Sequence, residues 1–312
     1  MRGKRKLAIF GAASLALLLT GAAYAADVPV AAKAPPMVGK SPVGSSPWDV
    51  SFGGLITTDY YFRGISQSNH GPSAGAYIEG LYNGAYGQWY LGLAGYSINW
   101  PTTFANGTIP GFSDPAAEID FYGGWRHEWG KYSADIGFIY YYYPEEQFGI
   151  DSDFWEIYWK GGYAVSDKAN VGLNVYYAPD ILNYGDAFFS PAGVAADARG
   201  IYASVTADYI YWEQNDWSAA ISGELGHWWI KDTGYLAFLG AGSVDPSYTY
   251  WNAGISFAYK AVTLDLRYHG TDLGATGCGS FLLFVPPHPS NSWCDDRFIA
   301  TLSFDTSLSD LK

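Results

Sequence analysis

The chain has 312 residues, a formal net charge of −13 and 15% charged residues, whereas a typical soluble domain has about 25%. Aromatic residues reach 18%, with 27 Tyr and 13 Trp, while apolar content is 49% and mean hydropathy is −0.05. This composition excludes a helical membrane protein, which would be more apolar, and a disordered chain, which would have few aromatics. The 2 Cys exclude a disulfide scaffold, and the acidic balance argues against a nucleic-acid partner.

The N-terminus reads as an export signal followed by a spacer. Four basic side chains lie within residues 2–6, an apolar run covers 7–19, and small residues end at Ala25. This order predicts a signal peptide over residues 1–25. Residues 26–47 are rich in Ala, Pro, Ser and Gly and predict a flexible periplasmic linker, either a bare spacer or a contact to peptidoglycan.

From Trp48 onward, apolar and polar side chains alternate with a period of two. Val262 and Leu264, for example, alternate with Thr263 and Asp265. Successive side chains of a strand point to opposite faces, so each such segment has one apolar and one polar face. The pattern predicts an antiparallel barrel of about twelve strands, with ten or fourteen as alternatives, near 48–63, 72–82, 86–97, 115–127, 131–142, 153–165, 168–178, 199–212, 216–229, 247–259, 261–269 and 296–306.

The first of these segments continues the alternation to residue 63. Continued alternation through 48–63 places Tyr60 and Phe62 on the apolar face. It places Asp59 and Arg63 on the polar face. We therefore expect Asp59 and Arg63 to face the interior from the first strand.

The connections between the segments alternate between short and long. Tight turns are predicted near residues 83–85, 128–130, 166–167, 214–215 and 260, and long loops over 98–114, 179–198, 230–246 and 270–295. Transmembrane barrels have short periplasmic turns and long external loops, and an even number of strands returns both termini to the periplasm. We therefore expect an outer-membrane β-barrel over residues 48–307 and a C-terminal tail over 308–312.

Tyr and Trp gather towards the ends of the predicted strands. These rings favour the membrane interface, because an apolar ring lies beside a polar tip. The alternative is aromatic packing inside a soluble β-sandwich. The interface aromatics expected from this pattern are Tyr60, Tyr61, Trp89, Trp129, Tyr140, Tyr141, Tyr142, Tyr143, Tyr176, Tyr177, Tyr209, Tyr211, Trp228, Trp229, Trp251 and Tyr268.

The stretch from Thr57 to Ser68, TTDYYFRGISQS, resembles the first-strand motif of the TorF family of porins. The likeness continues through Gly75 and Glu79 and returns in the segment 294–297, CDDR. It covers roughly residues 48–306 and implies an outer-membrane porin of unsettled substrate, with no catalytic residue. The chain departs from many such barrels because eight residues follow Phe304, its last strand aromatic.

No catalytic or metal-binding motif stands out. The chain has no HExxH, no CxxC and no G-x-S-x-G. We expect His227 and His269 to lie at the outer ends of their strands, where a barrel enzyme could place a catalytic group. An enzyme is nevertheless disfavoured, and we expect no cofactor and no metal.

Isolated charges fall on the predicted interior faces, where they either brace the barrel or line a water-filled path. We expect the bases to form a wall facing the acids, and acids to be in excess, which favours cations. The pore-lining candidates are Asp49, Asp59, Arg63, Glu79, Glu118, Asp120, Arg126, Asp135, Glu156, Lys160, Asp208, Glu224, Asp265 and Arg267.

The function predicted from these features is passive diffusion of small hydrophilic solutes through an outer-membrane porin. The alternatives are a structural or surface-interaction barrel plugged by side chains, and, third, a barrel enzyme. The expected partners are outer-membrane lipid, lipopolysaccharide and the barrel assembly machinery. Cys278 and Cys294, the only cysteines, should form a disulfide after export to an oxidising compartment, in a loop stiffened by Pro286, Pro287 and Pro289.

Overall fold

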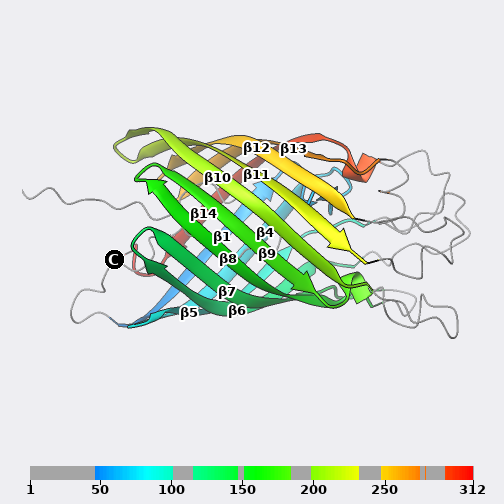
Figure 1. The fold of residues 1–312 in the computed structure, drawn as a ribbon, viewed down its shortest axis with the longest axis horizontal. Helices are drawn as coiled ribbons and strands as arrows, with labels where there is room; N and C mark the ends of the chain where they lie inside the picture. The colour runs from blue at the N-terminus through cyan, green and yellow to red at the C-terminus, as the bar shows by residue number, and fades with distance from the viewer. Residues whose placement is uncertain are drawn as a thin grey trace, which may run out of the picture.

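The computed structural model describes residues 46–100, 115–146, 151–183, 198–231, 247–274, 278 and 292–311. The predicted signal peptide and most of the linker lie outside these ranges. No helix within them is long and apolar enough to cross a membrane. The twelve strands of one barrel (Figure 1) are β1 (Trp48–Thr57), β4 (Ser73–Gly84), β5 (Gly87–Tyr96), β6 (Glu118–Trp129), β7 (Tyr132–Tyr142), β8 (Phe154–Ser166), β9 (Ala169–Ala178), β10 (Gly200–Gln214), β11 (Trp217–Ile230), β12 (Tyr248–Tyr259), β13 (Val262–Thr271) and β14 (Arg297–Ser307).

The sheet closes on itself without an edge. Each strand pairs antiparallel with its neighbours, and β1 pairs with both β4 and β14. Closure satisfies the backbone hydrogen bonds of every strand, as the hydrocarbon layer demands. The predicted antiparallel barrel of about twelve strands is confirmed.

The two ends of the barrel differ. Five hairpins have tight turns at one end, which we call the turn end, and the described chain both begins and finishes there (Figure 1). Trp48 pairs with Tyr82 beside one of these turns. The longer connections leave from the opposite end, which we call the loop end (Figure 1). The alternation of short and long connections is therefore confirmed.

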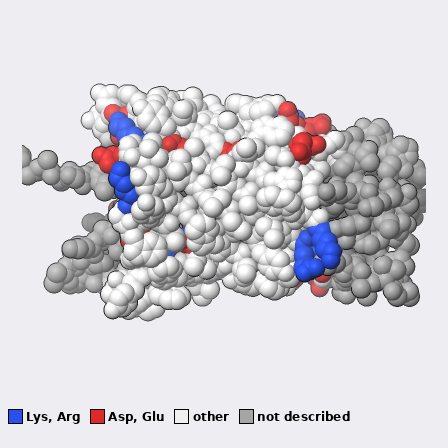
Figure 2. Space-filling view, in the orientation of Figure 1, with Lys and Arg blue, Asp and Glu red and all other residues white. Residues whose placement is uncertain are grey.

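The exterior is that of a transmembrane barrel. Leu173 is 44% exposed, and the nearby outward side chains of Val171 and Val205 are also apolar and exposed. Figure 2 shows charged side chains towards the two ends of the visible face and almost none across the middle. The inward positions alternate with these and carry buried polar and charged groups such as Asp265. This pattern is the one expected of lipid outside and polar groups inside.

Glycines on inward positions make room for tyrosine rings. Gly92 pairs with Tyr122 across β5 and β6, and a Cβ at Gly92 would lie 2.2 Å from that ring. A Cβ at Gly137 would lie 2.3 Å from the Tyr158 hydroxyl oxygen. Only glycine allows such a close approach, so the rings can lie against the barrel wall.

The first predicted strand is too long. β1 ends at Thr57, and residues 58–72 form a separate segment, the inward hairpin, with its own strands β2 (Tyr61–Phe62) and β3 (Ile65–Ser66). Its two-residue turn, Arg63–Gly64, has φ of 47° and 84°, as a type I′ turn requires. Alternation was therefore wrong about the apolar outer face of Tyr60 and Phe62, whereas Asp59 and Arg63 lie in the interior as expected but not on the first strand. These side chains belong to a loop, since the chain turns back before them.

The disulfide between Cys278 and Cys294 is confirmed, with their Cα atoms 5.9 Å apart. Cys294 ends a short 3-10 helix, η2 (Ser292–Cys294). Next to it, the Asp295 carbonyl accepts a hydrogen bond from the Tyr61 hydroxyl at 2.7 Å. The cross-linked loop therefore contacts the inward hairpin. The three prolines predicted to stiffen this loop lie outside the described residues.

The face assignment leads to a measurable difference in stability. We expect Leu173→Arg to cost about 2 to 4 kcal/mol of folding free energy in lipid, because its side chain faces the hydrocarbon. Asn174→Arg, one position away, should cost less, because Asn174 points inward and bonds Ser204. Urea titration of both variants in lipid vesicles measures the difference. The reverse ranking would contradict the assignment.

Candidate functional site

The inward hairpin is held together by one carboxylate. Asp59 accepts hydrogen bonds from the hydroxyls of Ser66 at 2.7 Å and Ser68 at 3.0 Å, and its second oxygen lies 2.7 Å from Nδ1 of His70. Asp59 is 3% exposed. The Asp of the TDYYFRG motif therefore holds the loop in shape by contacts within the loop. This explains why two serines and a histidine follow it so closely in the sequence.

The hairpin crosses the barrel interior near the loop end. The Tyr60 hydroxyl donates to Glu118 on β6. The Tyr248 hydroxyl of β12 donates to the Arg63 carbonyl at 2.9 Å, and the Tyr61 ring lies 5.5 Å from that of His269 on β13. Because β6 and β12 lie far apart around the ring of strands, these contacts span the interior.

At the tip of the hairpin, Arg63 is enclosed by what we call the Arg63 receptacle, formed by Glu156, Tyr176, Tyr202 and Trp228. Its two terminal nitrogens each lie 2.9 Å from an oxygen of Glu156. Its guanidinium carbon lies 4.8, 4.4 and 4.5 Å from the three ring centroids. Arg63 is 1% exposed, so a bidentate ion pair and cation–π contacts act together away from water.

A second ion pair lies deeper, towards the turn end. Arg126 donates to Glu79 at 2.7 Å and to Gln88 at 2.6 Å. Next to it, the Tyr90 hydroxyl lies 2.5 Å from both Asp135 and the Tyr158 hydroxyl. These groups lie on neighbouring strands β4 to β8 and form one polar layer of the wall.

A third ion pair lies across the barrel on β13. Arg267 donates to both oxygens of Asp265 at 3.0 Å and to Asn252 at 2.6 Å. The expectation of a basic wall facing an acidic wall is therefore wrong. Arg267 pairs with an acid on its own strand, Arg126 with one two strands away and Arg63 with one on β8, because a buried charge needs a partner within contact distance.

The other candidates lie inside or at the ends of the barrel. Asp49 accepts hydrogen bonds from Val50 and Ser309 at the turn end. Lys160 lies over the Tyr158 ring, with Nζ 4.9 Å from its centroid. The two remaining acids bond to neutral groups, Asp208 to Asn170 at 3.0 Å and Glu224 to Tyr202 at 2.9 Å. A pore-lining role stays a prediction for all fourteen.

One interior carboxylate stands out among the described residues. Asp120 is 0% exposed, and neither of its oxygens has a hydrogen-bond partner. Glu118, two positions earlier on the same face of β6, accepts from Tyr60 and, at 2.9 Å, from Tyr143. These two buried acids have no contacting base, and burial in such a pair disfavours ionisation of both carboxyls at once.

Several aromatics predicted at the membrane interface lie in the interior. Trp228 is 1% exposed, whereas its neighbour Trp229 is 52% exposed and faces outward. Tyr60, Tyr61, Tyr141 and Tyr143 are also buried. The prediction was wrong for these five and for Tyr176, whose ring lies in the Arg63 receptacle. On the strands it ignored the alternation of faces, and Tyr60 and Tyr61 lie in the inward hairpin. Because successive strand residues face opposite sides, alternation alone separates Trp228 from Trp229 and would have identified Trp228 as an interior residue of the Arg63 receptacle.

The histidines in the described part of the chain do not form a recognisable catalytic group. His269 is buried at the outer end of β13 and its Nδ1 lies 2.9 Å from the Tyr250 hydroxyl, while that of His227 lies 3.0 Å from Thr249 Oγ1. In the inward hairpin, the hydroxyls of Ser66 and Ser68 donate to the Asp59 carboxylate. A nucleophilic serine would instead donate to a histidine ring.

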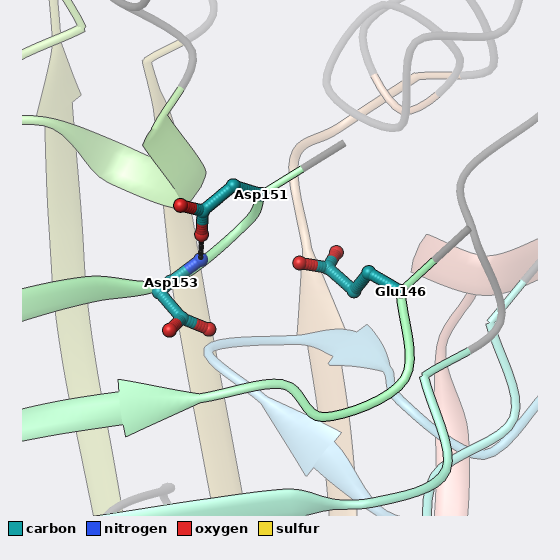
Figure 3. Close-up of side chains that lie close together, drawn as sticks. All are labelled: Glu146, Asp151 and Asp153. Atoms are coloured by element: carbon teal, nitrogen blue, oxygen red, sulfur yellow. Dashed lines mark hydrogen bonds between the residues drawn. The ribbon is translucent and has the colours of Figure 1, made fainter. Parts of the chain in front are cut away.

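Three carboxylates gather before β8 (Figure 3). The oxygens of Glu146, Asp151 and Asp153 lie within 4.8 Å of one another. Each already accepts a hydrogen bond, Asp151 from the Asp153 amide at 3.1 Å and Asp153 from Tyr140 at 2.7 Å. Burial raises the pKa of Asp153 above its ordinary value, and the bonds from Tyr143 and Tyr140 oppose this. The cluster orders the turn into β8, and we assign no ion to it.

Comparison with solved structures finds similar chains among outer-membrane proteins. The NanC porin has 9% identity and a TM-score of 0.44, with 82% of this chain and 98% of that chain covered. The KdgM porin has 9% identity and a TM-score of 0.42, with the same coverage. An outer membrane channel from Pseudomonas putida F1 has 14% identity and a TM-score of 0.43, with 86% and 99% covered. No curated protein matches the chain.

The sequence itself matches a protein family. The family model is described as a bacterial protein of unknown function, Gcw_chp, and it matches residues 42–281. The match begins in the linker, includes the inward hairpin and every strand up to β13, and ends in the loop that carries Cys278. It covers most of the chain, which therefore belongs to the Gcw_chp family.

Proposed function

We propose that this protein is an outer-membrane channel through which small hydrophilic solutes diffuse passively. The observation that carries the proposal is that the barrel interior is polar and charged and is crossed by a loop, the inward hairpin. The inward hairpin then acts as the constriction, at the loop end, which faces the outside of the cell. Transport of this kind needs no catalytic group.

We further propose a modest preference for cations. Seven carboxylates are buried in the described residues against three guanidinium groups, those of Arg63, Arg126 and Arg267. A narrow passage of low dielectric focuses the field of the excess acids. The buried acids are Asp59, Glu79, Glu118, Asp120, Asp135, Glu156 and Asp265.

The second candidate is a structural or surface-interaction barrel with a plugged interior. The observation that favours it is the depth of Arg63, which is 1% exposed and held in a bidentate ion pair. A hairpin fixed in this way would close the barrel at its loop end. A barrel enzyme has no comparable support from the described side chains.

A TorF-type porin is the finer identity that we propose, because the Thr57–Ser68 motif forms the constriction itself. A channel of this kind would lie in outer-membrane lipid beside lipopolysaccharide and be inserted by the barrel assembly machinery. The linker over residues 26–47 would extend into the periplasm.

Single-channel recording in planar lipid bilayers tests the proposal. We expect the refolded wild-type barrel to give discrete conductance steps in symmetrical potassium chloride. Folding is checked independently by β-rich circular dichroism and resistance to unfolding in cold detergent. A folded, inserted barrel that gives no conductance would favour the plugged barrel.

A further inference from the structure

The Arg63 receptacle is built by the barrel wall. Glu156 lies on β8, Tyr176 on β9, Tyr202 on β10 and Trp228 on β11. The three rings stand in one row, because Tyr176 pairs with Tyr202 and Tyr202 pairs with Trp228 across adjacent strands. Their relative positions are therefore set by strand register, which does not involve the inward hairpin.

The chemistry of the receptacle is specific for a guanidinium group. Both oxygens of Glu156 meet the two terminal nitrogens at 2.9 Å, which matches the planar fork of a guanidinium. The Tyr202 and Trp228 rings lie within 4.5 Å of the guanidinium carbon, as stacking and cation–π contacts require. An ammonium group could form an ion pair with Glu156 but not the two parallel hydrogen bonds that a planar guanidinium makes.

Arg63 reaches the receptacle from a small and strained element. Its φ of 47° is unusual for a residue with a side chain, and β2 and β3 pair through only two residue pairs. Without Arg63, Glu156 would keep a hydrogen bond from the Tyr141 hydroxyl at 3.0 Å but lose its contacting cation. A buried carboxylate in that state attracts a replacement cation.

We propose that the Arg63 receptacle is a binding site for solutes that carry a guanidinium group, and that Arg63 occupies it as an internal ligand. A solute guanidinium entering from the loop end replaces Arg63 and releases the tip of the hairpin. The proposal rests on the channel function for the arrival of the solute, and it names the class of cation that the passage selects.

The test uses ethylguanidinium, with ethylammonium and neutral ethylurea as controls, and the full-length barrel in detergent. Arg63→Ala empties the receptacle, and Arg63→Ala with Glu156→Gln removes its carboxylate charge as well. We expect calorimetric titration to show saturable ethylguanidinium binding to Arg63→Ala, at least tenfold tighter than to wild type, where Arg63 competes. The controls and the double variant should bind at least tenfold more weakly.

Failure of this site and failure of the channel can be told apart. A folded Arg63→Ala barrel without ethylguanidinium binding, or equal binding by the double variant, overturns the site. If Arg63→Ala does not fold, Arg63→Lys keeps the charge without the fork, and it should bind ethylguanidinium more tightly than wild type; equal binding overturns the site. Ethylguanidinium binding by a barrel that never conducts refutes the channel and leaves the site standing.

Discussion

Shortening the inward hairpin should raise single-channel conductance several-fold. The hairpin crosses the interior from β6 to β12, and the narrowest cross-section of a water-filled path limits its current. The cut is compatible with the fold, because Thr57 and Ser73 pair directly across β1 and β4. Residues 58–72 can therefore be replaced by Asn-Gly, which favours the two-residue tight turn that joins such a pair.

The measurement is single-channel current in planar bilayers at equal salt on both sides. A Tyr86→Ala control alters an exposed side chain in a turn at the opposite end and should leave the current unchanged. A shortened barrel with wild-type conductance would place the constriction deeper, in the layer of Arg126 and Glu79. Conductance by the shortened barrel alone would identify the wild type as plugged.

Removing the negative charge of β6 should have the second large effect, on selectivity. We expect Glu118→Gln combined with Asp120→Asn to lower the permeability ratio of cations to anions by roughly twofold or more. Both acids are buried, and neither contacts a base among the described residues. Burial without a contacting base disfavours ionisation of both acids, so the effect should be larger at higher pH, where the pair carries more negative charge.

The permeability ratio is obtained from the reversal potential under a salt gradient. A matched control, Glu213→Gln with Asp216→Asn, removes the same charge near the turn between β10 and β11, where both acids lie on the surface. The control should keep the wild-type reversal potential. The effect of the β6 variant should shrink as salt concentration rises, because ions screen the charges. An anion-selective wild type would refute the preference.

The family resemblance acquires a structural meaning from the hairpin. The alternating pattern predicts a first strand that runs through Arg63, within the motif TDYYFRGISQS. In the structure its Asp59 organises the loop, Tyr60 contacts β6, and Arg63 enters the receptacle. The most recognisable stretch of the sequence therefore forms the inward hairpin rather than the membrane-facing wall.

The sequence by itself determined the barrel, its twelve strands and its two unlike ends. Alternation and turn spacing are local properties of a strand, so Leu264 and Asp265 reveal their opposite faces without knowledge of any neighbour. The pairing of Cys278 with Cys294 also followed from the sequence, since no other cysteine exists.

The tertiary structure alone decided which interior groups meet and that a hairpin enters the barrel. Alternation runs unbroken through Thr57 into the hairpin, because a short inward strand has the same period as the strand before it. The meeting of Arg63 with Glu156 and the row from Tyr176 to Trp228 depends on barrel closure and on the register between strands distant in sequence. Those contacts are non-local, so no pattern along the chain encodes them.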